Sequence, residues 1–140
     1  MGEVRVEVEL TSVADQVLAR QGYKKPSEIR RTKVSALVDT GAVQCVVPPF
    51  VADTLGLART FRKVVEVADG RKQEVDVTEP ALMVIMGRPT YEQCLVLGDE
   101  VIVGQTALES TDLHVDCREG KLLPNPAHPD QPVVKIKRAG

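Results

Sequence analysis

Valine or leucine occupies every second position from residue 4 to residue 10, with charged residues in between. This period of two predicts a strand with one buried face. Residues 12–21 are the best helical stretch, with Ser12 as a candidate N-cap and Gly22 as its end. A polar loop follows, and residues 33–38 predict a mostly buried strand that leads directly into Asp39.

Short apolar runs separated by turn residues fill the rest of the chain. A hairpin is predicted within residues 63–77, because Asp69-Gly70 lies between two alternating runs. We expect further short strands at 44–48, 81–86, 93–97, 101–103, 113–116 and 121–123, helices at 50–56 and 106–110, and turns at 87–91 and 98–100. About ten short strands with few helices predict a mainly β fold, in the form of a closed β-barrel.

The chain divides into a domain and a tail. A length of 140 residues suits one domain, placed at residues 1–123, with residues 12–31 as an insertion between the first two strands. Residues 124–140 begin with a proline-rich stretch that predicts an exposed, extended tail in which His128 is solvated. Residues 133–137 are compatible with a terminal strand.

Composition narrows the class of protein. A formal net charge of −2 and an aromatic content of 3% provide neither a basic surface nor stacking side chains for nucleic acid. The sequence has no apolar run of about 20 residues to span a membrane and no basic, apolar leader, so a cytoplasmic protein is expected. Three widely spaced cysteines fit reduced thiols, and Cys117 with His114 lacks the second pair of a metal site. We therefore expect neither metal nor cofactor.

The most informative segment is 36–42, in which an apolar strand runs into Asp39, Thr40 and Gly41. A carboxylate at the end of a buried strand is costly unless it is paired or hydrogen-bonded, so an acid at this place indicates a function. Gly41 permits a sharp turn whose N–H groups approach the carboxylate, and the Thr40 hydroxyl can both donate and accept a hydrogen bond.

Two further segments follow this one. The Asp69-Gly70 turn lies about 30 residues beyond Asp39, and the segment VIVG, at 101–104, lies about 60 residues beyond it, before a short helix. With LVDTGA, VADG, VIVG, TALES, LHVD and GKLLP in this order, the chain from residue 4 to residue 123 resembles the single-domain retropepsin-like aspartic proteases, which are enzymes of the retroviral type.

The resemblance implies an acid-protease β-barrel that works as a homodimer, because each chain carries one Asp loop and the reaction needs two carboxylates. It implies that Asp39 is catalytic and activates a water molecule for peptide hydrolysis without a covalent intermediate. Thr40 would brace the two loops, Gly41 would offer its N–H to the carboxylates, and Ala42 would line the substrate groove.

Two more groups of residues receive roles from the resemblance. One group would form the tip of a flap over an extended peptide substrate: Ala68, Asp69 and Gly70. The other would lie in a strand beneath the Asp loop and support it: Ile102, Val103 and Gly104.

The chain departs from the family pattern at three places, one of which is the stretch 12–31, longer than the corresponding connection in the viral enzymes. Gln105 stands where the viral enzymes usually have an arginine that ties the dimer, and the flap tip is charged rather than apolar and rich in glycine. These departures keep a second function open, a retropepsin-like dimerisation or peptide-binding module with weak or no catalysis. Asp69 is a second candidate acid, but Asp before Gly at a hairpin tip is first of all a turn former.

Overall fold

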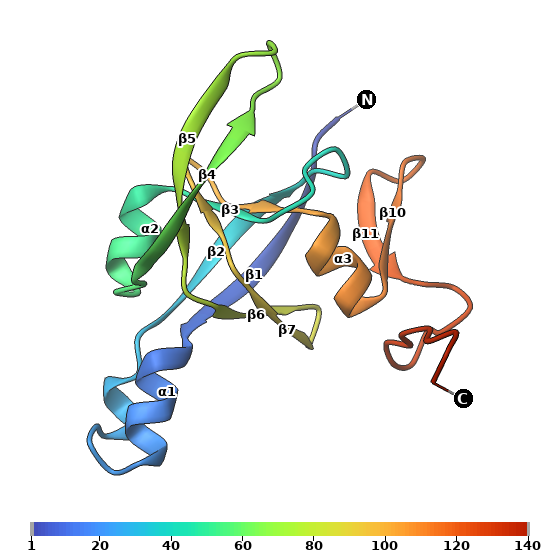
Figure 1. Cartoon of the computed structure of the whole chain (residues 1–140). Coiled ribbons are helices and arrows are strands. Elements are labelled where there is room, and N and C mark those ends of the chain that lie inside the picture. Colours follow the sequence, from blue (N-terminus) through green and yellow to red (C-terminus); the bar gives the residue numbers. More distant parts are fainter. Residues whose placement is uncertain (1, 140) are drawn as a thin grey trace.

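The computed structural model describes residues 2–139 and shows a mainly β protein (Figure 1). Within these residues, nine strands form one curled sheet and two more form a separate hairpin. The strands of the large sheet are β1 (Val4–Ser12), β2 (Arg31–Val38), β3 (Val46–Val47), β4 (Arg59–Glu66), β5 (Lys72–Thr78), β6 (Ala81–Ile85), β7 (Arg88–Glu92), β8 (Leu95–Val96) and β9 (Ile102–Val103). The separate hairpin and the helical segments are β10 (Leu113–Asp116), β11 (Lys121–Pro124), α1 (Val13–Arg20), η1 (Pro26–Glu28), α2 (Pro49–Thr54) and α3 (Gln105–Thr111). No helix in this part of the chain has the length and apolar character needed to cross a membrane.

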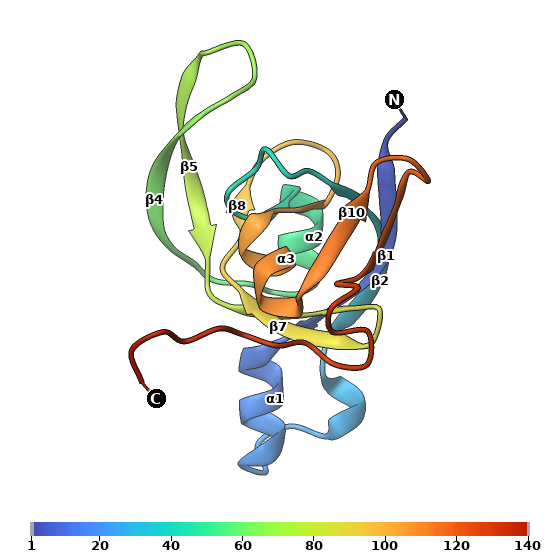
Figure 2. The same ribbon diagram turned by 90° about the vertical axis from the view of Figure 1, so that its right-hand side faces the viewer.

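The large sheet is open. Its strand order is β4-β5-β8-β3-β9-β2-β1-β6-β7, so β4 and β7 are its two edges within the described residues. The β4–β5 hairpin leaves the body and projects beyond it (Figures 1 and 2), which carries β4 away from β7. The prediction of a mainly β fold is confirmed, whereas the prediction of a closed barrel is wrong, because the sheet curls only into a half-barrel.

β1 lies between β2 and β6 and pairs antiparallel with both. Its alternation places Val8 and Leu10 in the core, as the sequence predicts. β1 leads into α1, and the Ser12 Oγ at their junction accepts a hydrogen bond from the Asp15 N–H at 3.1 Å. The predicted helix and its N-cap are confirmed.

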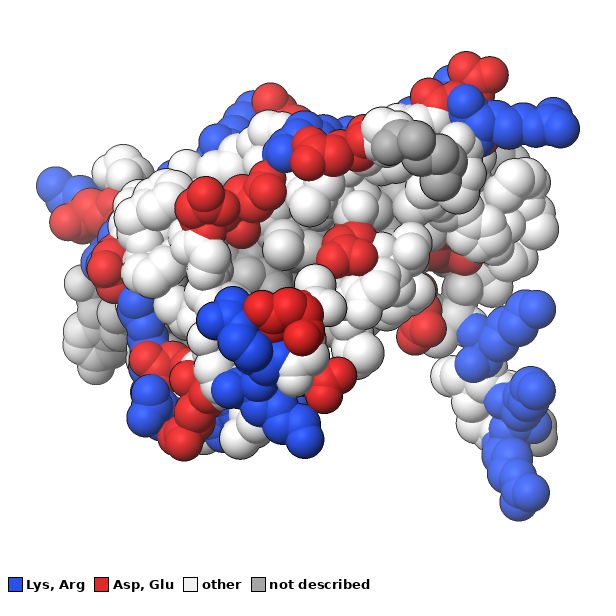
Figure 3. Space-filling view, turned by 90° about the horizontal axis from the view of Figure 1, so that it is seen from above, with Lys and Arg blue, Asp and Glu red and all other residues white. Residues whose placement is uncertain are grey.

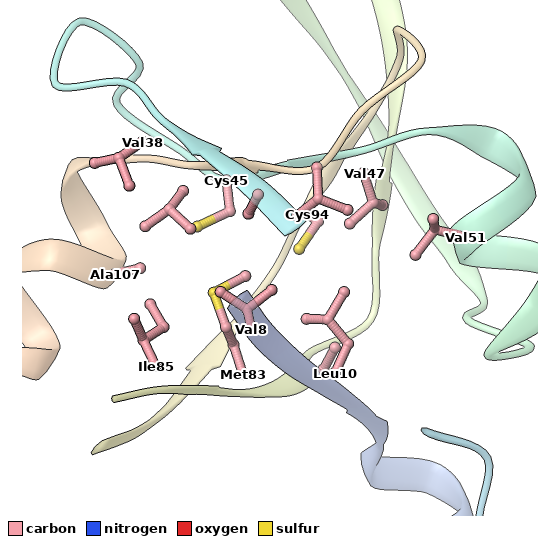
Figure 4. Packing of buried hydrophobic residues seen from close by; sticks show 14 of the residues in the cluster. Val8, Leu10, Val38, Cys45, Val47, Val51, Met83, Ile85, Cys94 and Ala107 are labelled. Atoms are coloured by element: carbon pink, nitrogen blue, oxygen red, sulfur yellow. The ribbon is translucent and has the colours of Figure 1, made fainter. Parts of the chain in front are cut away.

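The core is built from aliphatic side chains and two cysteines. Cys45 and Cys94 are fully buried among residues such as Val8 and Met83 (Figure 4). Burial raises the pKa of both thiols, that of Cys45 to about 12, so neither is a thiolate near neutral pH. Because the thiolate is the reactive form of cysteine, these two residues contribute packing to the core rather than a nucleophile.

β7 occupies residues for which the sequence predicts a turn. The turn is confined to Met86 and Gly87, whose φ angles are both positive (51° and 77°), as a two-residue hairpin of this kind requires. The side chains that β7 buries are polar: Arg88, Thr90 and Glu92. Because the inward-facing residues of this strand are polar, hydrophobic periodicity does not reveal the strand. The predicted turn at 87–91 is therefore wrong.

The C-terminal tail is fastened to the domain by Asp112. Its carboxylate accepts hydrogen bonds from Asn125 Nδ2 and from the Val133 N–H, both at 3.0 Å, and lies 2.7 Å from His128 Nδ1. These partners, Asn125 first, lower the pKa of Asp112 to about 2. The predicted solvation of His128 is wrong, because its ring packs against this carboxylate, and residues 133–137 do not form a strand.

Residues 12–31 form the connection between β1 and β2, and the Asp15 side chain links α1 to the later residues of this connection. The Asp15 side chain is only 1% exposed. One carboxylate oxygen accepts a hydrogen bond from Lys24 Nζ at 2.8 Å, and the other accepts from the Nε (2.8 Å) and the backbone N–H (2.9 Å) of Arg30. These bonds, those of the Arg30 side chain above all, hold the pKa of Asp15 well below its ordinary value.

Asp15→Asn is expected to lower the free energy of unfolding by roughly 2–4 kcal/mol near neutral pH, because it removes the buried partner of two cations. Since the pKa of Asp15 is depressed in the folded state, this stabilisation is fully present above the ordinary carboxyl pKa of about 3.9 and declines as the pH falls below it. Chemical denaturation of both proteins over a pH series measures the difference.

Asp53→Asn is the matched control, because it breaks the exposed pair between Asp53 and Arg59. It should cost less than about 1 kcal/mol at every pH. If the cost of Asp15→Asn stayed constant into acid, the ionic explanation of this cluster would be refuted.

Candidate functional site

Asp39 lies immediately after β2, a strand that is paired on both sides. β2 runs antiparallel to β1 and parallel to β9, and the Asp39 N–H extends the second pairing by donating to the Val103 carbonyl oxygen at 3.0 Å. Asp39 itself is half-buried. The sheet therefore fixes the backbone of Asp39 while its side chain stays accessible from outside.

The loop after Asp39 turns back onto the carboxylate. The Gly41 N–H donates to Asp39 Oδ1 at 2.8 Å, and the Ala42 N–H donates to the Asp39 carbonyl oxygen at 3.1 Å. A Cβ at Gly41 would lie 3.2 Å from Oδ1 and would crowd it. Within residues 2–139 the carboxylate receives no other hydrogen bond, so most of its acceptor sites are open to a water molecule or a second acid.

Residues 102–104 lie directly against this loop. Ile102 and Val103 form β9, and at Gly104 a Cβ would lie 2.6 Å from the Gln44 carbonyl oxygen and 2.8 Å from that of Ala42. The φ of Gly104 is −101°, which any residue can adopt. Glycine is needed here because there is no space for a Cβ, and the carbonyl groups of Ala42 and Gln44 pack directly against the Gly104 backbone.

α3 holds the loop from the other side. The Gln105 N–H donates to the Ala42 carbonyl oxygen at 2.8 Å, and the Thr106 N–H donates to that of Val43 at 3.1 Å. The Gln105 side chain adds a hydrogen bond from Nε2 to the Thr40 carbonyl oxygen at 2.9 Å. A neutral brace within one chain therefore occupies the place where the resemblance led us to look for an arginine.

A buried carboxylate behind the loop was missed by the sequence analysis. Glu92 accepts hydrogen bonds from the hydroxyls of Thr90 (2.7 Å) and Thr106 (2.6 Å), and lies 3.7 Å from Cys45 Sγ. The Cys45 sulfur in turn accepts from the Gly104 N–H at 3.4 Å. The only signal in the sequence was the polar alternation of Thr90 and Glu92, which without the fold resembles a solvent-facing turn.

A cleft of about 750 Å³ separates the loop from the β4–β5 hairpin, and we call it the Asp39 cleft. On the loop side it is lined by Asp39, Gly41, Ala42 and residues that follow them. On the other side its lining includes every residue from 63 to 68. Because successive side chains of a strand point to opposite faces, an unbroken run of lining residues means that the edge of β4 borders the cleft.

The tip of the hairpin is a turn stabilised by Asp69. The Asp69 carboxylate accepts hydrogen bonds from the Arg71 N–H (3.0 Å) and Nε (2.6 Å), and Gly70 has a φ of 87°, which glycine adopts without strain. Of the three predicted tip residues, Ala68 borders the Asp39 cleft, while Asp69 and Gly70 lie beyond it. These contacts favour the role of Asp69 as a turn former.

Thr40 is exposed at the top of the loop, between two further surface clefts. One, of about 560 Å³, lies between the start of β1 and the β10–β11 hairpin; the other, of about 610 Å³, lies between α3, β10 and residues 133–135. The Thr40 hydroxyl has no hydrogen-bond partner in the described part of the chain. It is therefore available to a second molecule at this surface.

The other side chains that could bind a metal ion lie far apart. His114 lies in β10 and Cys117 is exposed in the turn that follows. Between residues 2 and 139 no three His, Cys, Asp or Glu side chains come together in a way that could hold a metal ion.

Neither a protein-family model nor a curated protein matches this sequence. The geometry around Asp39 therefore carries the functional inference.

Proposed function

We propose that the chain is a homodimeric aspartic endopeptidase of the retropepsin-like type. The observation that supports this most is the position of the Asp39 carboxylate and the small number of hydrogen bonds that it accepts. It stands at the end of a doubly paired strand, is held in its own chain by one hydrogen bond, and borders a cleft of the size that ligands occupy. A structural carboxylate would be expected to have its acceptor sites filled, as those of Asp15 are.

The chemistry requires two such carboxylates close together. Two carboxyl groups in contact cannot both ionise easily, because their negative charges would repel each other. The pair therefore shares one proton, as in aspartic proteases generally. The ionised member then takes a proton from a water molecule, and the protonated member polarises the scissile carbonyl and later supplies the proton to the leaving amine. One chain supplies one Asp39, so a second copy must supply the other across a two-fold axis.

An extended peptide is the substrate that this cleft suits. In the described residues β4 pairs only with β5, which leaves the N–H and C=O groups of its outer edge free. A peptide lying in the Asp39 cleft can add to this edge as a further strand, and its main chain is then held beside Asp39 whatever its sequence.

A peptide-binding module without turnover is the second candidate. Binding needs the cleft and the free edge of β4 but not a second carboxylate. The observation that favours it is the charged tip of the hairpin, where Asp69 and Arg71 bind each other instead of presenting an apolar surface to a substrate.

If the site is shared between two chains, peptide hydrolysis per chain should fall on dilution. At protein concentrations below the dissociation constant of the dimer, the activity per chain is expected to fall roughly in proportion to the protein concentration, because the fraction of chains that are in dimers falls in the same way. Cleavage of a peptide library at pH 4–7, measured alongside sedimentation over the same concentration series, tests this. Full activity from a protein that sediments as a monomer would refute the shared site.

A further inference from the structure

Lys63 is a charged side chain of the Asp39 cleft that the proposed reaction does not use. It lies in β4, and its Nζ donates a hydrogen bond to Gln44 Oε1 at 2.9 Å, just past the Asp loop. Gln44 is itself positioned by a hydrogen bond from its Nε2 to the Gln93 carbonyl oxygen at 3.2 Å. The ammonium group is thus held at the cleft by a neutral amide, and one of its three N–H donors serves that bond.

Arg62 and Arg71 of the same hairpin differ in this respect, whereas Lys72 of β5, like Lys63, has no acidic partner in the described part of the chain. Arg62 is bound by Glu74 and Asp76, both at 3.2 Å, and Arg71 is bound by Asp69 at 2.6 Å. Within the described part of the chain, Lys63 has no carboxylate partner, and it is the one cation among the residues that line the Asp39 cleft. Glu66 and Asp39 are the acids of that lining.

Apart from Gln44 and Gly41, the rest of the lining is aliphatic. Its apolar side chains are small or of medium size and none is aromatic: Ala42, Val43, Val46, Val64, Val65, Val67, Ala68, Leu95, Leu97 and Ile102. Such walls favour aliphatic residues in a bound peptide and provide no stacking partner for aromatic ones.

We propose that Lys63 selects an acidic side chain in the peptide that occupies the Asp39 cleft, next to aliphatic residues that fill its walls. This inference rests on the cleft of the proposed function. A carboxylate of the peptide can take the two free donors of Nζ or replace the Gln44 amide, and a charge-assisted hydrogen bond is stronger than the neutral one it replaces. A basic side chain at the same position would meet Lys63 as a like charge.

The surface charge around the cleft does not provide this selection by itself. In the view from above, acidic and basic side chains lie near one another over most of the molecule, with uncharged surface between them, and only a group at the lower right is basic alone (Figure 3). The electric fields of neighbouring positive and negative side chains largely cancel at distances greater than the Debye length. A preference for acidic peptides would therefore arise from a contact with one residue, and substitution of that residue can reverse it.

The test uses fluorescent peptides of valine, leucine and alanine in which one position at a time is Glu, Gln or Lys. Binding to the Asp39→Asn protein is measured by fluorescence anisotropy, and cleavage is measured with the unsubstituted protein. At one position we expect Glu to be preferred over Lys by at least about five-fold, with Gln in between and a smaller difference in high salt.

Lys63→Glu should reverse this order, and Lys63→Met should abolish it. Lys72→Glu is the matched control, because Lys72 is an exposed residue of β5 outside the cleft lining, and it should leave the order unchanged. Binding or cleavage with no preference for Glu, or with one that survives Lys63→Glu, would overturn this inference and leave the endopeptidase in place. Selective binding without cleavage would overturn the endopeptidase and leave this inference in place. Failure of every peptide to bind or be cleaved would overturn both.

Discussion

Asp39→Asn is expected to reduce peptide cleavage by about a thousand-fold or more if Asp39 is the acid of the proposed endopeptidase, while the fold and the proposed dimer persist. The amide cannot take a proton from water or share one with a second Asp39, so the general acid and base are both lost. It can still accept the Gly41 hydrogen bond, because Asn Oδ1 can stand in the place of Asp39 Oδ1. Rates on a peptide library at pH 4–7, with sedimentation and circular dichroism of the same samples, measure the effect.

Asp53→Asn is a suitable control for this loss, since Asp53 is an exposed residue of α2 that does not line the Asp39 cleft. Its activity should equal that of the unsubstituted protein. Equal residual cleavage by the Asp39→Asn and unsubstituted proteins would leave the peptide-binding module as the function.

Gly104→Ala is expected to lower activity by about a hundred-fold, because a displacement of about 1 Å in a catalytic group can cost that much. The added Cβ would lie 2.6 Å from the Gln44 carbonyl oxygen, which belongs to the backbone and cannot turn aside as the end of a side chain can, so the Asp loop has to move. We also expect the free energy of unfolding to fall by roughly 1–3 kcal/mol, as for other overpacked sites. Activity per folded molecule and chemical denaturation separate the two effects.

Gly98→Ala provides the comparison. Gly98 has a φ of 73° in a surface turn, and a Cβ there would meet nothing within 4 Å. Alanine at this position costs about 1 kcal/mol through backbone strain and should leave activity per folded molecule unchanged. If Gly104→Ala retained full activity, the close approach at Gly104 would not be what positions Asp39.

Features that depend on neighbours in the sequence were predicted well. The alternation in β1, the Ser12 cap and the turn at Asp69-Gly70 all rest on contacts within a few residues, and the structure has each of them. The Asp loop could be singled out for the same reason, because an acid directly after an apolar strand is visible in the sequence.

Other features depend on distant partners, and periodicity and local motifs did not predict them. Polar residues of β7 were taken for a turn because Arg88 and Glu92 face inward, where Arg88 donates to the Thr111 carbonyl oxygen and Glu92 accepts from Thr106. His128 was expected in solvent for the same reason, since nothing nearby in the sequence shows that Asp112 will hold it.

The sequence by itself determined most of the strands, the cap at Ser12, the turn at Asp69-Gly70, and the place of the one acid that a buried strand delivers to the surface. These follow from side-chain periodicity and backbone preferences, which act over a few residues. Only the tertiary structure decided that the sheet stays open and that the edge of β4 borders Asp39. It also placed Lys63 at Gln44 and Glu92 behind the Asp loop. Each of these depends on the packing of segments far apart in the chain, and the energy of such a contact exists only once both sides are in place.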